Sequence, residues 1–177
     1  MKPERHKPPR PPLDSEGLQR LALFYVGRYA TTGTKLRSYL TRKVRERGWE
    51  GERPDLDAMI ERFKDLGYID DGAFASSRAA SLQRRGYGER RVAQALQAAG
   101  IGEEDAADAN AQAREGALAA ALRFAERRRI GPFAAVELDR EARQKAFAAM
   151  MRAGHPMDVV RRVLEASPGE IPDSDNI

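Results

Sequence analysis

The residues best suited to binding chemistry in this sequence are four arginines around a Gly-Tyr-Gly step. They are Arg84, Arg85, Arg90 and Arg91, with Tyr87 at the centre of the step. A guanidinium group presents a planar fork of donors that matches carboxylates and phosphates. A break between two helices can also leave backbone amides free at the start of the second one. We therefore predict that this segment, the central basic turn, binds a partner. Tyr87 either stacks on that partner or fills the turn from inside.

A second concentration of positive charge lies between residues 28 and 47. Its cations are Arg28, Lys35, Arg37, Arg42, Lys43, Arg45 and Arg47, and its only acid is Glu46. The formal net charge of the whole chain is only +4, so the positive charge is unevenly placed. Such placement suits a polyanionic or acidic partner, although charged runs also simply solvate helices. We take Arg37, Arg42 and Lys43, the first-repeat cluster, as the next candidates for a partner contact.

No set of residues suggests catalysis. The two histidines, His6 and His155, are far apart in the sequence, and neither belongs to a zinc-binding motif such as H-E-x-x-H. Asp70 and Asp71 directly precede an apolar helical series, where an N-cap and first-turn acids belong. The chain has no cysteine, which excludes disulfides and thiolate metal sites. We therefore expect no enzymatic activity, no metal and no cofactor, and a capping or packing role for His155.

Hydrophobic periodicity predicts helices throughout the chain. Apolar residues recur at helical spacing, as in the stripe formed by Leu18, Leu21, Ala22 and Tyr25. Helices are expected to end at Gly48, Gly67, Gly86, Gly100 and Gly154, and another is expected to run to about Arg128, before the Gly131-Pro132 break. A single helix is expected from about residue 134 to 153. Because no stretch alternates apolar and polar residues with β-branched enrichment, the predicted fold class is all-α.

Three of these glycines define an internal repeat. Gly48, Gly100 and Gly154 each follow a helix that carries apolar residues four and eight positions earlier. The apolar residues are Val44, Leu96 and Met150 in the first set, and Leu40, Val92 and Ala146 in the second. This recurrence predicts a tandem array of three three-helix repeats. The predicted repeats span residues 15–67, 68–111 and 112–167.

The two ends of the chain are predicted to be disordered tails. Residues 1–14 are basic and rich in proline, and residues 168–177 combine proline and glycine with several acids. The basic N-terminus lacks the apolar stretch of a signal peptide, and no segment approaches the roughly 20 apolar residues of a membrane span. We therefore expect a cytoplasmic monomer with no membrane partner.

Two stretches of the chain carry a resemblance to a known family. YIDDGAFA at residues 68–75 and QRRGYGERRVAQALQAAGI at residues 83–101 resemble the central motif of the RecX family, bacterial modulators of the RecA recombinase. The similarity extends over roughly residues 16–167. It implies an elongated, curved array of three-helix repeats that binds in the groove of the RecA filament. It also implies restraint of RecA's ATP hydrolysis, strand exchange and co-protease activity in recombination and SOS repair.

The chain departs from the family pattern at the turn of the third repeat. The family usually has something like Arg-Gly-Phe there, whereas this chain has Ala153-Gly154-His155. This difference removes the basis for assigning a partner contact to that turn. The overall resemblance does not depend on it.

A helix-turn-helix transcription factor is the alternative function, because such modules place a second helix in the major groove of DNA. Neither residues 36–44 nor residues 92–99 offer a clear set of Asn, Gln and Arg side chains to contact bases. An RNA-binding helical repeat would carry the same few side chains in every repeat, and this chain does not. Any nucleic-acid binding is therefore expected to be weak, sequence-independent and made through phosphates.

Overall fold

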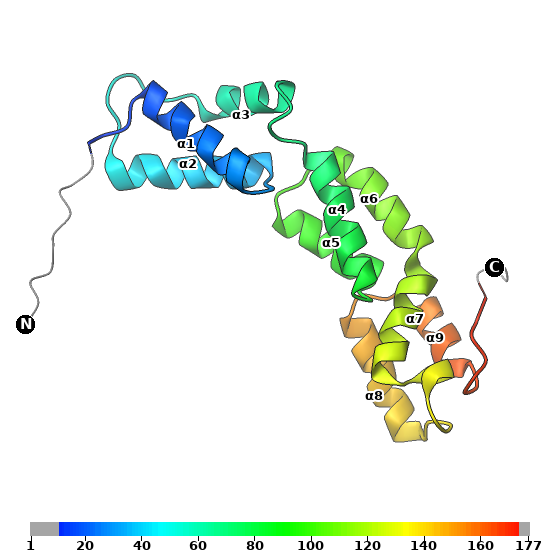
Figure 1. Ribbon diagram of the computed structural model, residues 1–177. Coiled ribbons are helices and arrows are strands. Elements are labelled where there is room, and N and C mark those ends of the chain that lie inside the picture. Colours follow the sequence, from blue (N-terminus) through cyan, green and yellow to red (C-terminus); the bar gives the residue numbers. More distant parts are fainter. Residues whose placement is uncertain (1–10, 174–177) are drawn as a thin grey trace, which may run out of the picture. The chain divides into compact units, whose positions relative to one another are not determined.

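The computed structural model describes residues 11–173, which form nine α-helices and one short 3-10 helix (Figure 1). The described residues contain no strand, only an isolated bridge between Leu13 and Trp49, so the all-α prediction is confirmed. The helices are α1 (Ser15–Arg28), α2 (Gly33–Arg47), α3 (Leu56–Asp65), α4 (Asp71–Arg84), α5 (Glu89–Ala98), α6 (Glu103–Glu115), α7 (Ala117–Arg128), η1 (Gly131–Phe133), α8 (Arg140–Arg152) and α9 (Met157–Glu165).

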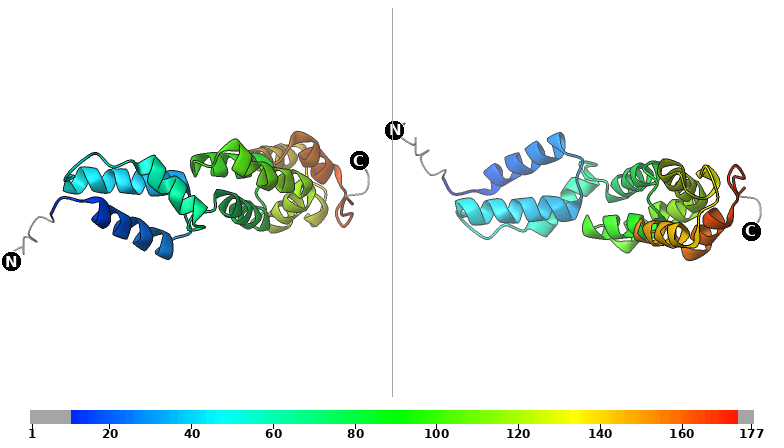
Figure 2. Two further views of the ribbon diagram at one scale, coloured as in Figure 1. Left: turned by 90° about the horizontal axis from the view of Figure 1, so that it is seen from above. Right: turned by 90° about the horizontal axis from the view of Figure 1, so that it is seen from below.

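The chain divides into two compact units, residues 1–70 and residues 71–177. The first unit contains α1, α2 and α3, and α2 packs against both of the others. Helices α1 and α2 lie side by side in both views of Figure 2. The buried core of this unit consists of Leu13, Leu18, Ala22, Leu36, Leu40, Ile60, Phe63 and Ile69. Burial of these apolar faces, rather than helix propensity, supplies most of the stability of such short helices.

The segment just before α1 differs from the predicted tail over residues 1–14. Leu13 is 1% exposed, and its N–H donates to the carbonyl of Gly48 at 3.0 Å. The side chain of Asp14 accepts a hydrogen bond from the N–H of Gly17 and caps α1. The prediction of a tail was wrong for residues 11–14, because Leu13 is buried and its backbone is hydrogen-bonded to Gly48 and Glu50, far along the chain. Residues 1–10 lie outside the described residues.

The second unit contains two cores. The first lies among α4, α5 and α6, with α4 alongside α6 (Figure 1), and many of its buried residues are alanines. Small side chains let helices pack at short interaxial distances. The second core lies among α7, α8 and α9 and is built on larger side chains, including Phe124, Met150 and Val163. Helix α6 continues to Glu115, so the predicted repeat boundary between residues 111 and 112 falls inside a helix.

The helix predicted over residues 134–153 begins only at Arg140. Residues 134–139 follow η1 without helical structure, and the Asp139 side chain accepts from the N–H of Ala142 at 2.7 Å. An Asp at this place stabilises a helix start more than a helix interior, because its carboxylate binds an otherwise unpaired amide. The prediction missed this N-cap.

The predicted C-terminal tail is also partly bonded. The N–H of Gly169 donates to the carbonyl of Pro132 at 2.8 Å, and the Arg162 guanidinium donates to the carbonyl of Asp173. The expectation of a disordered tail is therefore corrected for residues 168–173, which return to η1 and α9. Residues 174–177 lie outside the described part of the chain.

Glycines end helices at the predicted positions. Gly67, Gly86, Gly100 and Gly154 have φ between 72° and 90°, where L side chains are strained. In each case two backbone bonds close the end of the helix, as in Gly100 N–H to Gln97 O and Ile101 N–H to Leu96 O. The positions eight residues before Gly48, Gly100 and Gly154 are all buried, which supports the repeat.

Candidate partner-binding site

The central basic turn joins α4 to α5 within the second unit. Arg84 is the last residue of α4, and Arg90 and Arg91 lie in the first turn of α5. Gly86, with φ of 72°, ends α4 by donating its N–H to the carbonyl of Gln83 at 2.8 Å. All four arginine side chains of the turn are exposed. The local sequence therefore projects four guanidinium groups from one tight connection.

This connection packs against the connection between α8 and α9. The N–H of Gly88 donates to the carbonyl of Ala153 at 3.0 Å, and the N–H of Arg90 donates to the carbonyl of Gly154 at 3.1 Å. A Cβ on Gly88 would lie 2.3 Å from the oxygen of Gly154, and one on Gly154 would lie 2.5 Å from the nitrogen of Arg91. We call this contact of residues 86–91 with residues 153–155 the turn junction.

The turn junction changes what the central basic turn offers to a ligand. The amides of Gly88 and Arg90 are bonded within the protein, so the expectation of free amides at the start of α5 was wrong for these two groups. A phosphate or carboxylate can therefore be bound there by guanidinium side chains and not by those two amides. At Gly88 and Gly154 the two turns approach so closely that neither position has room for a Cβ. The junction therefore holds the backbone beneath the arginines in one conformation.

His155 lies inside the turn junction. Its side chain is completely buried, its Nε2 lies 3.1 Å from the carbonyl oxygen of Gly86, and its ring meets Phe124 edge-on at 5.5 Å. Burial lowers the pKa of the His155 imidazole, and the bond to Gly86 opposes this shift only in part. The ring is therefore neutral at pH 7 and donates from Nε2. The predicted packing role of His155 is confirmed.

Tyr87 points toward the protein interior. It is half-buried and packs against both cores of the second unit. The Arg85 guanidinium carbon lies 5.5 Å from the centre of the Tyr87 ring, a cation–π contact. Of the two roles considered for Tyr87, the structure supports the filling of the turn from inside. A direct contact of Tyr87 with a partner stays a prediction.

Arg127, at the end of α7, belongs to the same basic surface and was missed in the sequence. Its guanidinium donates to the carbonyl of Arg85. Arg128 beside it covers the ring of Phe124, with 5.3 Å between the guanidinium carbon and the ring centre. The available signal was the run of three arginines at residues 127–129, just before the Gly131-Pro132 break. Nothing in the sequence indicates that this run reaches the central basic turn.

The four arginines of the central basic turn have no acidic partner in the part of the chain that the structure describes. Within residues 11–173, none of Arg84, Arg85, Arg90 and Arg91 forms an ion pair with a carboxylate. Arg90 and Arg91 also lie at a helix N-terminus, where positive charge opposes the helix dipole. Their placement is therefore not explained by the stability of α5, although the carbonyl end of α8 nearby offsets part of the charge.

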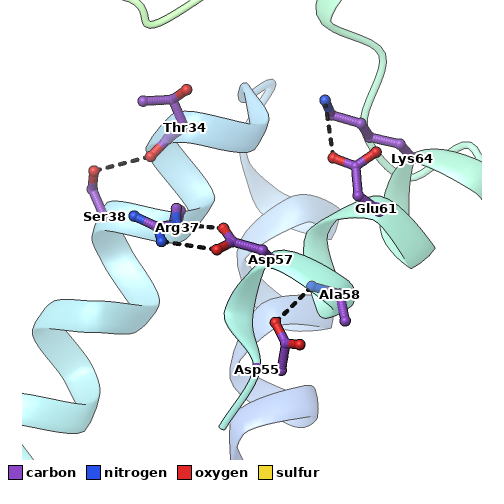
Figure 3. Close-up of polar contacts among 8 residues, drawn as sticks. All are labelled: Thr34, Arg37, Ser38, Asp55, Asp57, Ala58, Glu61 and Lys64. Carbon is purple, nitrogen blue, oxygen red and sulfur yellow. Dashed lines mark hydrogen bonds and ion pairs between the residues drawn. The ribbon is translucent and has the colours of Figure 1, made fainter.

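The first-repeat cluster, in the first unit, has internal partners. The Arg37 guanidinium of α2 donates two hydrogen bonds to the Asp57 carboxylate of α3 (Figure 3). The distances are 2.6 Å from Nε to Oδ1 and 3.0 Å from Nη2 to Oδ2. This hydrogen bond raises the pKa of Arg37 and lowers the pKa of Asp57. Both side chains are exposed, and exposed pairs contribute little to stability. Arg37 is thus engaged in joining two helices.

Arg42 and Lys43 share one carboxylate and one aromatic ring. Their side-chain nitrogens lie 3.4 Å and 2.7 Å from the carboxylate oxygens of Glu46. The hydrogen bond from Lys43 lowers the pKa of Glu46. The two cations also lie 5.7 Å and 5.8 Å from the centre of the Tyr39 ring. Every member of the first-repeat cluster therefore has a partner inside the protein.

The described residues contain no group of three or more histidines and acids that could hold a metal ion. Within the same residues, no helix is long and apolar enough to cross a membrane.

Comparison with known proteins places the central basic turn in a described domain. The model of the second three-helix domain of RecX matches residues 70–109, which include all of α4 and α5. The regulatory protein RecX of Myxococcus xanthus is 31% identical over 161 residues, covering 85% of this chain and 86% of the relative. The regulatory protein RecX of Agrobacterium fabrum is 31% identical over 156 residues, covering 86% and 84%.

Two solved structures share the fold. The crystal structure of RecX from Lactobacillus salivarius superposes with a TM-score of 0.64 at 18% identity, covering 85% of this chain and 94% of the other. A second crystal structure of a regulatory protein RecX gives a TM-score of 0.59 at 23% identity, covering 85% and 73%. These likenesses show that the chain shares the all-α fold of the two structures.

Proposed function

Because the chain belongs to the RecX family of regulatory proteins, we propose that it binds the RecA filament on DNA and restrains RecA. The restrained activities are ATP hydrolysis, strand exchange and co-protease activity. The protein acts by occupying the filament and catalyses no reaction of its own. Its direct contact with DNA is weak, independent of sequence and reduced by salt, because it is made mainly through phosphates.

The observation that carries this proposal is the set of four arginines on a turn whose backbone is held in place, none with a carboxylate partner within residues 11–173. Four exposed guanidinium groups have no carboxylate partner among the described residues, and the backbone beneath them is held by the turn junction. Because the backbone of the turn is already held, binding needs no ordering of a loop, and only the arginine side chains lose conformational freedom. Acidic loops of a filament protein and phosphates of its DNA both match guanidinium donors.

The proposal is tested by measuring ATP hydrolysis by RecA on single-stranded DNA while this protein is titrated in. We expect the rate to fall toward a plateau at sub-stoichiometric to stoichiometric amounts of the protein. The protein alone should show no hydrolysis of ATP or nucleic acid that follows the protein peak during purification. A RecA rate unchanged by an excess of folded protein would contradict the proposal.

A further inference from the structure

The first unit carries a row of aromatic rings and cations that the central basic turn does not explain. The Arg28 guanidinium carbon lies 6.0 Å from the ring centres of both Phe24 and Tyr29. Tyr29 meets Tyr25 at 5.3 Å, and Tyr25 stacks on Tyr39 at 4.3 Å with 20° between the rings. These five residues, from the end of α1 and the middle of α2, form one continuous series of contacts.

Two further cations extend this series along α2. Arg42 and Lys43 both lie within 6 Å of the Tyr39 ring centre. We call the seven residues Phe24, Tyr25, Arg28, Tyr29, Tyr39, Arg42 and Lys43 the aromatic–basic ladder. The only acid between residues 24 and 47 is Glu46, which both cations of α2 approach. Within residues 24–47 the cations therefore outnumber the acids by seven to one.

Core packing does not account for the outer rings of the ladder. Phe24 is 60% exposed and Tyr29 is 51% exposed, whereas the core of the unit lies beneath α1 at Leu18 and Ala22. A single exposed apolar residue is ordinary on a protein surface. Exposed rings separated by a guanidinium group are different, because that combination provides flat faces for bases and positive charge for phosphates.

The chemistry of the ladder favours one occupant. Single-stranded DNA exposes base faces that can stack on aromatic rings, while a duplex hides those faces inside its own stack. A protein partner would also accept exposed rings, but the excess of cations over acids in this segment matches a phosphate backbone better. We propose that the aromatic–basic ladder binds single-stranded DNA. Bases stack on Phe24 and Tyr29, and phosphates contact Arg28, Arg42 and Lys43.

This inference deepens the proposed function, on which it rests for its biological setting, because the RecA filament carries single-stranded DNA. Its test uses the isolated full-length protein without RecA, so the two proposals fail separately. If RecA is unaffected by this protein but oligothymidine still binds through the rings, the proposed function is wrong, while the binding of single-stranded DNA by the ladder is supported.

The test measures the affinity for fluorescently labelled oligothymidine by anisotropy, at several salt concentrations. Replacing Phe24 or Tyr29 by Leu should weaken binding by about tenfold each, because stacking of a base is lost. The dependence of affinity on salt should not change with these variants, since no phosphate contact is removed. The control is Leu66→Ala, an apolar residue of the same unit that is 59% exposed and lies outside the ladder.

Replacing the cations should have the opposite signature. Arg28→Gln or Lys43→Gln should flatten the slope of log affinity against log salt by about 0.7 each, the value for one phosphate of a single strand. Phe24→Trp keeps a ring, so it should bind as wild type, and its added fluorescence should be quenched by oligothymidine. The parent protein, with Trp49 alone, supplies the background signal.

Three results would contradict the proposal that the ladder binds single-stranded DNA. One is wild-type affinity in the folded Leu variants, together with no quenching in Phe24→Trp. Another is absence of oligothymidine binding by the wild-type protein, or binding weaker than to a duplex of the same length. The last is loss of RecA inhibition in the Leu variants with oligothymidine binding intact, which would show that the rings contact protein. Should a Leu variant fail to fold, the quenching of Phe24→Trp still decides the matter.

Discussion

The central basic turn and the first-repeat cluster look alike in sequence but differ in what their side chains contact. Arg37, Arg42 and Lys43 each reach a carboxylate of their own unit. Arg84, Arg85, Arg90 and Arg91 reach none among the described residues. A cation that already has a partner must lose it, or share it, in order to bind another molecule. The unpaired set is therefore the better candidate for the main contact with RecA.

The two regions also differ in how the backbone is held. The cluster lies along a regular helix, α2, whose shape depends only on its own hydrogen bonds and its packed face. The central basic turn depends on a second turn 60 or more residues away in the sequence, through the bonds of the turn junction. This dependence makes the central basic turn sensitive to substitutions that leave every arginine in place.

The largest expected effect is on RecA inhibition. Reversing Arg90 and Arg91 to Glu places like charges against phosphates or acidic loops, which costs several kcal/mol across an interface. The concentration for half-maximal inhibition of RecA ATP hydrolysis should rise by roughly a hundredfold. Because both side chains are exposed, the free energy of unfolding should change by no more than about 1 kcal/mol for the pair.

The matched control for this change is the reversal of Arg140 and Arg143 to Glu. These two residues are also exposed and also lie in the first turn of a helix, α8, so the change in charge is the same and falls at the same end of a helix. Inhibition should stay within about twofold of wild type. If the control loses as much inhibition, net charge alone is responsible. If reversal of Arg42 and Lys43 costs more than reversal of Arg90 and Arg91, the ranking of the two regions is wrong.

The next largest effect is on folding, at the turn junction. Gly88→Ala would place a Cβ 2.3 Å from the carbonyl oxygen of Gly154, a contact that backbone atoms cannot relieve without moving. We expect a loss of about 2–4 kcal/mol in the free energy of unfolding, measured by urea denaturation. Gly102→Ala is the control, because Gly102 also precedes a helix with extended backbone but has nothing within 4 Å.

The Gly102 control should stay within about 1 kcal/mol of wild type. Equal behaviour of the two variants would show that the close approach of the turns at Gly88 is relaxed in solution. In that case the turn junction would not hold the backbone of the central basic turn in one conformation.

A smaller effect concerns pH, through His155. Burial lowers the pKa of the folded imidazole below its ordinary 6.5, so the unfolded chain takes up a proton first as the pH falls. Stability should therefore be complete above about pH 6.5 and should decrease below it, by at most about 1.4 kcal/mol per pH unit for one proton. The loss should level off below the folded-state pKa.

The contribution of His155 is isolated by comparison with His155→Phe, which keeps a ring against Phe124 but cannot be protonated. Carboxylates titrate in both proteins, so the difference between their stability curves belongs to the histidine. The difference should change between pH 7 and pH 5. Parallel curves over this range would mean that His155 is not buried and neutral in the folded protein.

The smallest effect is expected for the exposed pair of Arg37 and Asp57. Asp57→Asn removes the carboxylate charge that pairs with Arg37, yet exposed pairs contribute little because water and salt screen them. The midpoint of thermal unfolding should shift by no more than about 2 °C, and the shift should vanish at 1 M salt. A larger, salt-independent shift would show that the pair holds α3 on α2.

The sequence by itself determined the features that depend on neighbours along the chain. Helix ends at Gly67, Gly86, Gly100 and Gly154 were predictable, because a glycine with positive φ closes a helix through residues only a few positions away. The apolar stripes gave the all-α class and the repeated buried positions for the same reason. The start of α8 is also a local feature, because the Asp139 side chain caps it by accepting from the N–H of Ala142. A start at about residue 134 was predicted without this N-cap.

Only the tertiary structure decided which groups meet across the chain. The packing of Leu13 against residues 48–50, the bond from Arg127 to Arg85 and the contact of His155 with Gly86 join residues 35 or more positions apart. Sequence patterns predict that a side chain faces inward or outward, but not which other turn it meets. That choice depends on how helices pack, since the same apolar stripe can be buried against several partners. For this reason the sequence located both sets of basic residues, and the structure showed that, among residues 11–173, one set has carboxylate partners and the other has none.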